Sequence, residues 1–156
     1  MDTKALIMNT SPNSNNGYML IFRGTDWYQG LSPEQMQQIA DRWMAWFNGL
    51  KENGQAVAGN PLEPQGKVVS GKNRVVSDGP FAESKEAVGG FIHVLVDTFE
   101  EAVEIAKSCP GLDLGGTIEI RPVLSECPVW KRAAARLNIE RPPLPLASQL
   151  ETLVYK

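Results

Sequence analysis

The sequence predicts an α+β fold of the ferredoxin-like type, with βαββαβ order and a β-hairpin inserted between the second and third strands. Two observations lead to this prediction: apolar strand-like runs alternate with helical segments, and each helical segment carries one apolar stripe. Two such helices cover the same face of one sheet, which is the split βαβ arrangement. The 156 residues are 42% hydrophobic and 21% charged, which suits one domain with its own core.

The first half of the chain supplies a strand, a long helix and a second strand. Residues 18–23 form an apolar run that ends at Arg23, as expected of a central strand covered on both faces. Residues 32–35, Ser-Pro-Glu-Gln, combine a capping box with a proline at the first helical position. The helix that starts there ends at Asn-Gly, residues 53–54, and residues 55–59 form the short second strand.

Three aromatic residues of this helix, Trp43, Trp46 and Phe47, lie on or beside its apolar stripe. They are either an aromatic binding site or part of the core beneath the sheet. Helical spacing of three and four residues favours core packing.

Residues 67–70 and 74–77 flank Gly-Lys-Asn and predict the inserted hairpin. Its arms are short and their outer residues are polar. We therefore expect the hairpin to lie at an edge of the sheet.

The second half repeats the strand and helix pattern. Residues 91–97 form the third strand, and Thr98 with Glu101 makes a second capping box at the start of the second helix. This helix ends at Cys-Pro-Gly, residues 109–111, and the strictly alternating residues 117–123 form the last strand. The predicted organisation is a flexible leader at 1–17, a domain at 18–123, and a C-terminal extension at 124–156 that is rich in proline.

Composition excludes several classes of function. The net charge of −3 and the pI of about 5.2 argue against a nucleic-acid partner. No apolar run approaches the ~20 residues of a membrane helix, and the N-terminus lacks the apolar core of a signal peptide, so we expect no membrane association and a cytoplasmic location. The chain has one histidine and two isolated cysteines, Cys109 and Cys127, so we expect no metal site. It also has no glycine-rich phosphate-binding loop, so we expect no cofactor.

The face of the sheet away from the helices is also apolar. Phe91, Leu95 and either Tyr18 or Met19 are expected on it, which is too apolar a surface to stay in water. Pairing of two such faces in a homodimer would bury it. Polar residues on the same face would then line a cavity between the subunits.

One stretch resembles a known signature. Residues 78–86, Asp-Gly-Pro-Phe-Ala-Glu-Ser-Lys-Glu, followed by Gly-Gly-Phe at 89–91, are similar to the motif of the DGPF branch of the YCII-related family. Ser84 stands where threonine is usual. Tyr-Met-Leu at 18–20 and Glu-Ile-Arg-Pro-Val at 119–123 support the resemblance, which covers residues 18–123.

The resemblance implies a dimeric α+β barrel built from two ferredoxin-like subunits, in agreement with the order of elements. Relatives include proposed acid–base enzymes that use a histidine and an aspartate. Some members are encoded beside alternative sigma factors, which implies a sigma-factor association as a further possibility.

Two candidate catalytic residues follow from the pattern. His93 is the single histidine, and alternation places it opposite the aliphatic set that faces the helices, so it points into the expected dimer cavity. It would act there as a general base, or be held by one neighbour in the barrel wall. Asp78 would take a proton or hold a polar substrate, or bond its own backbone in a turn around Gly79.

Three cations are candidate ligand-binding residues. Arg23 and Arg121 would bind a carboxylate in the cavity, or pair with Glu119 across strands. Lys85 would reach an anionic ligand, or lie with its neighbouring acids on a solvated helix start.

The sequence therefore leaves two functions open. One is a protein that binds a small polar or anionic metabolite at the dimer interface, with cofactor-free acid–base chemistry by His93 or Asp78. The alternative is a non-catalytic accessory protein that binds a ligand or partner and is linked to alternative sigma factor signalling.

Overall fold

The computed structural model of the chain describes residues 16–79, 86–125 and 127–138. The elements in chain order are β1 (Tyr18–Arg23), α1 (Pro33–Glu52), β2 (Ala56–Pro61), β3 (Lys67–Ser70), β4 (Val75–Asp78), β5 (Val88–Val94), α2 (Phe99–Lys107), the 3₁₀ helix η1 (Pro110–Leu114), β6 (Thr117–Pro122) and α3 (Pro128–Leu137). Most of the predicted leader, the C-terminal extension after residue 138, and Lys85 lie outside the described residues. No helix within the described ranges is both long and apolar enough to span a membrane.

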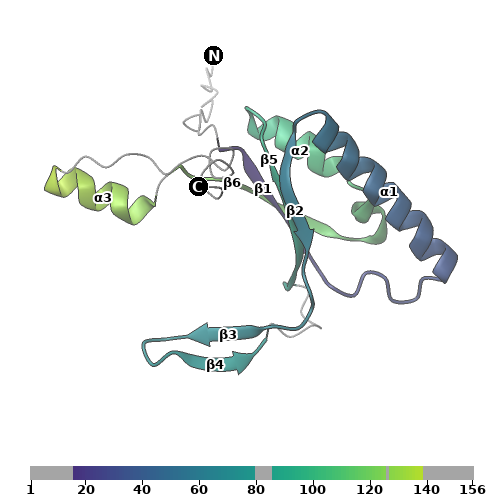
Figure 1. The fold of residues 1–156 in the computed structure, drawn as a ribbon, viewed down its shortest axis with the longest axis horizontal. Coiled ribbons are helices and arrows are strands. Elements are labelled where there is room, and N and C mark those ends of the chain that lie inside the picture. Colours follow the sequence, from purple (N-terminus) through teal and green to yellow (C-terminus); the bar gives the residue numbers. More distant parts are fainter. Residues whose placement is uncertain (1–15, 80–85, 126, 139–156) are drawn as a thin grey trace, which may run out of the picture.

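Four antiparallel strands form the main sheet in the order β2-β5-β1-β6. Counted along the chain, these are its second, third, first and fourth strands, which is the ferredoxin-like order. Helices α1 and α2 lie on the same side of this sheet (Figure 1). The predicted α+β fold with an inserted hairpin is confirmed.

Helices α1 and α2 both begin at the predicted capping boxes. The Ser32 hydroxyl accepts from the Gln35 backbone N–H at 3.2 Å, and the Gln35 side chain accepts from the Ser32 N–H at 2.8 Å. Thr98 and Glu101 exchange the same two bonds at 3.2 and 3.0 Å. Each box satisfies two backbone donors that the first helical turn leaves without a partner, so local sequence determines where each helix starts.

Strand β5 begins and ends three residues earlier than the predicted strand at 91–97. Two glycines explain the shift, because a Cβ on Gly89 would lie 2.5 Å from the Gly24 carbonyl oxygen and one on Gly90 would lie 3.0 Å from the Asn60 oxygen. Without side chains, these residues let the neighbouring backbones approach, and the strand extends through both of them.

The hairpin β3–β4 is a separate two-stranded sheet that projects away from the main sheet (Figure 1). The hairpin itself is as predicted, but its expected position at an edge of the main sheet is wrong. Pro61 and Pro64 lack the backbone N–H that a continuing ladder needs, so the chain leaves the sheet after β2. Val69 and Val76 pair across the hairpin and are both exposed.

The core lies between the main sheet and the two helices. Leu20 and Val94 are completely buried at its centre, and Ile92 is 5% exposed. The cluster around them consists of Tyr18, Leu50, Ala102, Ile105 and Ala106.

Neither α1 nor α2 covers the opposite side of the sheet, where α3 projects away from the strands (Figure 1), and we call this side the open face. Strand alternation and register place on it Met19, Ile21, Arg23, Phe91, His93, Glu119 and Arg121.

Candidate functional site

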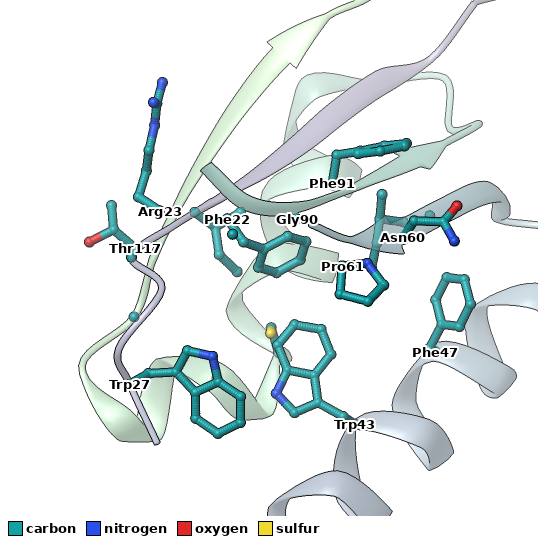
Figure 2. Close-up of a pocket in the computed structure, with 18 of the residues that line it drawn as sticks. Phe22, Arg23, Trp27, Trp43, Phe47, Asn60, Pro61, Gly90, Phe91 and Thr117 are labelled. Carbon is teal, nitrogen blue, oxygen red and sulfur yellow. The ribbon is translucent and has the colours of Figure 1, made fainter. Parts of the chain in front are cut away.

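A pocket of about 380 Å³ lies between α1, the main sheet and η1. Figure 2 shows the rings of Phe22, Trp27, Trp43 and Phe47 around it, with Pro61 at one side. These side chains come from the end of β1, the following loop, α1 and the end of β2. The α1 stripe that predicts core packing therefore has two roles: Trp43 and Phe47 pack on the core cluster and also line this cavity.

Two glycines allow aromatic rings of the pocket to pack closely against the backbone. A Cβ on Gly111 would lie 2.9 Å from Cζ2 of Trp43. A Cβ on Gly59 would lie 2.9 Å from Cγ1 of Ile92 and 3.3 Å from Cε2 of Phe47. The indole and the phenyl ring thus pack against bare backbone, which a side chain at either glycine would prevent.

The aromatic wall is held by edge contacts and one hydrogen bond. The centroid of Trp43 lies 5.1 Å from that of Phe22 and 5.3 Å from that of Trp46, in both cases edge to face. Trp46 donates its indole N–H to the Ser108 hydroxyl at 2.8 Å, which ties α1 to the end of α2. Trp27 contacts Tyr28 edge to face and is 44% exposed, so it forms part of the pocket mouth.

Cys109 also lines the pocket and is 3% exposed. Burial raises the pKa of its thiol above the ordinary value, so the sulfur stays protonated at neutral pH. It contributes an apolar wall and a weak donor, because the thiolate is the nucleophilic form. Among the described residues, no group of three histidine, cysteine or acidic side chains could hold a metal ion.

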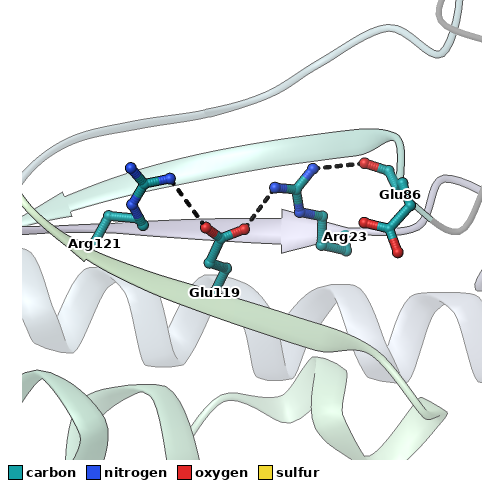
Figure 3. A network of polar contacts seen from close by, with 4 residues as sticks. All are labelled: Arg23, Glu86, Glu119 and Arg121. Atoms are coloured by element: carbon teal, nitrogen blue, oxygen red, sulfur yellow. Dashed lines mark hydrogen bonds and ion pairs between the residues drawn. The ribbon is translucent and has the colours of Figure 1, made fainter.

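The open face carries a network of charges (Figure 3). Glu119 accepts from Arg23 at 2.5 Å and from Arg121 at 3.2 Å, and Arg23 also donates to the Glu86 carbonyl oxygen at 2.6 Å. The bond from Arg23, followed by that from Arg121, holds the pKa of Glu119 below its usual value. The pairing of both arginines with Glu119, which the sequence left as an alternative to ligand binding, is thus present in the single chain.

His93 lies on the open face, as its place in the strand predicts. It is 8% exposed, and its Nε2 lies 2.5 Å from the backbone oxygen of Asn16. A carbonyl only accepts, so Nε2 carries the proton and Nδ1 is the nitrogen with a free lone pair in the neutral ring. His93 is opposite Met19, and Met19 is opposite Arg121, so the histidine and this arginine flank one residue of the central strand.

Asp78 lies elsewhere, at the end of the projecting hairpin. Its side chain is 87% exposed and pairs with Lys67, its cross-strand neighbour. The structure therefore brings Arg23 and Arg121 together around Glu119, with His93 on the same face, but it places Asp78 on a different sheet from His93. Lys85 lies outside the described residues.

The sequence did not predict the aromatic pocket as a site. Two features of the sequence could have indicated the pocket. Met44 widens the apolar stripe of α1, and glycines stand at positions 59 and 111. What the sequence could not give is the distance between α1 and the sheet.

Comparisons with known proteins point to one family. A family model described as the YCII-related domain matches residues 6–128, well over half of the chain. No curated protein matches. One solved structure that matches is 5-chloro-2-hydroxyhydroquinone dehydrochlorinase (TftG) from Burkholderia phenoliruptrix AC1100 in complex with 2,5-dihydroxybenzoquinone, at 15% identity and a TM-score of 0.37, covering 70% of this chain and 95% of that one. That likeness is too remote to assign an activity.

Proposed function

The chain belongs to the YCII-related family, and from this premise we propose that it binds a small, largely apolar molecule in the pocket between α1 and the main sheet. The observation that carries the proposal is the pocket itself. Its volume of about 380 Å³ falls within the ~300–1,000 Å³ typical of small-molecule sites. Its wall is mostly aromatic and aliphatic with a few polar groups, which is the usual composition of such sites.

The proposal is tested by filling the pocket without disturbing the core. Ala40 lies on α1, lines the pocket and is exposed, so Ala40→Trp would occupy the cavity. Ala45 is exposed on the same helix but is not part of the lining, so Ala45→Trp is a matched control.

Titration with the uncharged dye phenylnaphthylamine, which fluoresces in apolar surroundings, measures the affinity. We expect saturable binding to the wild type and to Ala45→Trp, and at least about tenfold weaker binding to Ala40→Trp, because the added indole takes the volume that the dye needs. Equal affinities of the two variants would refute binding in this pocket.

A second proposal concerns the open face, where Met19, Ile21 and Phe91 are only half buried in the single chain. Pairing of two open faces in a homodimer would remove this apolar surface from water. Light scattering should then give twice the chain mass of 17.1 kDa. Ile21→Arg should give a monomer, and a wild-type monomer at micromolar concentration would contradict the proposal.

Such a dimer would enclose the predicted cavity for a small polar or anionic metabolite. Arg121 supports this, because its side chain is 67% exposed and it shares the single carboxylate of Glu119 with Arg23. Acid–base chemistry by His93 or Asp78 stays a proposal. If an activity were found and survived both His93→Ala and Asp78→Asn, that chemistry would be wrong.

The remaining interpretations from the sequence stay predictions. They are membership of the DGPF branch, the cytoplasmic location, and the alternative role as an accessory protein linked to sigma factor signalling. Affinity purification with and without residues 124–156 would test the last of these, and recovery of no partner in either case would count against it.

A further inference from the structure

We infer that the ligand of the α1 pocket is an uncharged, flat ring compound that carries a hydrogen-bond acceptor. The inference rests on the proposed binding in this pocket and deepens it by naming the chemical class. Three properties of the lining lead to it: the charge that the wall presents, the shape of its surfaces, and its hydrogen-bond donors.

The first property is that no cation among the described residues is directed into the pocket. Within that part of the chain, Arg23 is the one charged residue in the lining, and its guanidinium is bonded to Glu119 at 2.5 Å and to the Glu86 carbonyl oxygen at 2.6 Å. Figure 2 shows the Arg23 side chain extending away from the rings, and Figure 3 shows it in the network on the open face. An anion in the pocket would lose its hydration without gaining a counter-charge, which is strongly unfavourable.

The second property is the shape of the wall. The flat rings of Phe22, Trp27, Trp43 and Phe47 surround the space in Figure 2. Aromatic side chains make their best contacts with a flat ring, by offset stacking or edge to face, at centroid distances of about 4.5–7 Å. A planar ligand therefore contacts several of these rings at once, whereas a branched aliphatic molecule would not.

The third property is the kind of polar group that the lining presents. Trp46 uses its indole N–H on Ser108, but no hydrogen bond found in the described part of the chain uses the indole N–H of Trp27 or Trp43. An indole N–H donates and cannot accept. The other polar side chains of the lining, Asn60 and Thr117, are exposed and lie at its rim. The lining thus presents two indole N–H donors, that of Trp27 at the pocket mouth and that of Trp43, and a ligand with a carbonyl or similar acceptor would accept from them.

Three naphthalenes substituted at the same ring carbon separate these properties. Acetylnaphthalene is uncharged and has an acceptor, ethylnaphthalene is uncharged and has none, and naphthoate has acceptors but is an anion at neutral pH. Quenching of tryptophan fluorescence and displacement of phenylnaphthylamine give the affinity of each for the full chain.

We expect acetylnaphthalene to bind tightest. Ethylnaphthalene should bind about three- to tenfold more weakly, which is what loss of one hydrogen bond removes. Naphthoate should bind at least about tenfold more weakly, because its carboxylate must leave water unpaired. In Trp27→Phe, which keeps a flat ring at this partly exposed site but removes the N–H donor, the ratio of the affinity for the ketone to that for ethylnaphthalene should fall.

The outcomes that overturn the inference are distinct from failure of the proposed function. Binding of naphthoate as tight as that of the ketone would overturn the uncharged class but leave the pocket as a binding site. Equal binding of the ketone and ethylnaphthalene would overturn the acceptor. No binding of any naphthalene or of the dye would overturn both the inference and the proposed function.

Discussion

Gly17, close to His93, is a residue where adding a single methyl group should strongly lower the free energy of unfolding. Its backbone φ is +69°, a value that L-residues with a Cβ rarely adopt. A Cβ at this position would fall on the carbonyl oxygen of Val94 and lie 3.0 Å from the Leu95 Cα. The Gly17 carbonyl also accepts from Val123 at 2.9 Å, so the backbone here is held on more than one side.

The magnitude of Gly17→Ala follows from three contributions. The left-handed conformation costs about 1–2 kcal/mol for a residue with a Cβ. Overlap with packed backbone adds about 1–3 kcal/mol. The alanine also restricts the unfolded chain, which offsets about 0.4–1 kcal/mol. The free energy of unfolding should therefore fall by about 1–5 kcal/mol.

Gly71 provides the matched control, because its φ is also +69° and nothing lies within 4 Å of the position of a Cβ. Gly71→Ala carries the conformational cost without the overlap. Urea unfolding followed by circular dichroism should show Gly17→Ala to be less stable than Gly71→Ala by about 1–3 kcal/mol. Equal stabilities would refute the steric argument, and a wild-type stability for both would refute the conformational one as well.

Three further predictions concern polar contacts. In Glu119→Gln the free energy of unfolding should depend less on pH than in the wild type. The wild-type carboxylate has a lowered pKa when folded, so its contribution to stability is present above the unfolded value of about 4.3 and is lost as pH falls below it. Parallel curves of unfolding free energy against pH for the two proteins, between neutral and acid pH, would contradict this. Trp46→Phe removes the bond to Ser108 and should cost about 0.5–1.5 kcal/mol in urea unfolding, with Ser108→Ala giving a similar loss; a neutral effect of both would mean that this bond does not hold α1. Arg42→Met breaks an ion pair with Asp113 whose side chains are both more than half exposed, so the change in stability should stay below about 0.5 kcal/mol, and a larger loss would show that α1 and η1 depend on it.

Local chemistry was enough to predict most of the fold. The capping boxes at Ser32 and Thr98 depend on residues three positions apart, so they are readable without knowledge of distant contacts. The same holds for the face that His93 occupies, because alternation along a strand follows from the strand alone. The family match and the observed strand order agree with what these local signals predicted.

Features that depend on tertiary distances were not predictable in the same way. The early start of β5 reflects close approach of Gly89 and Gly90 to other strands. The aromatic pocket reflects how α1 stands against the sheet, and Trp43 has the same helical spacing whether it fills a core or lines a cavity. The sequence named pairing of Arg23 with Glu119 as an alternative to ligand binding, but deciding between the two needs the register between β1 and β6, which no short pattern encodes.

The projecting hairpin has a consequence for how related chains can vary. The hairpin follows β2 and precedes β5 in the chain. These two strands are already paired with each other at Pro61 and Gly90. Lengthening, shortening or rewriting β3 and β4 would therefore leave the four-strand register intact. Insertions and deletions among homologues should gather in this arm, and a foreign peptide spliced into its turn at Lys72 should be displayed without disturbing the aromatic pocket.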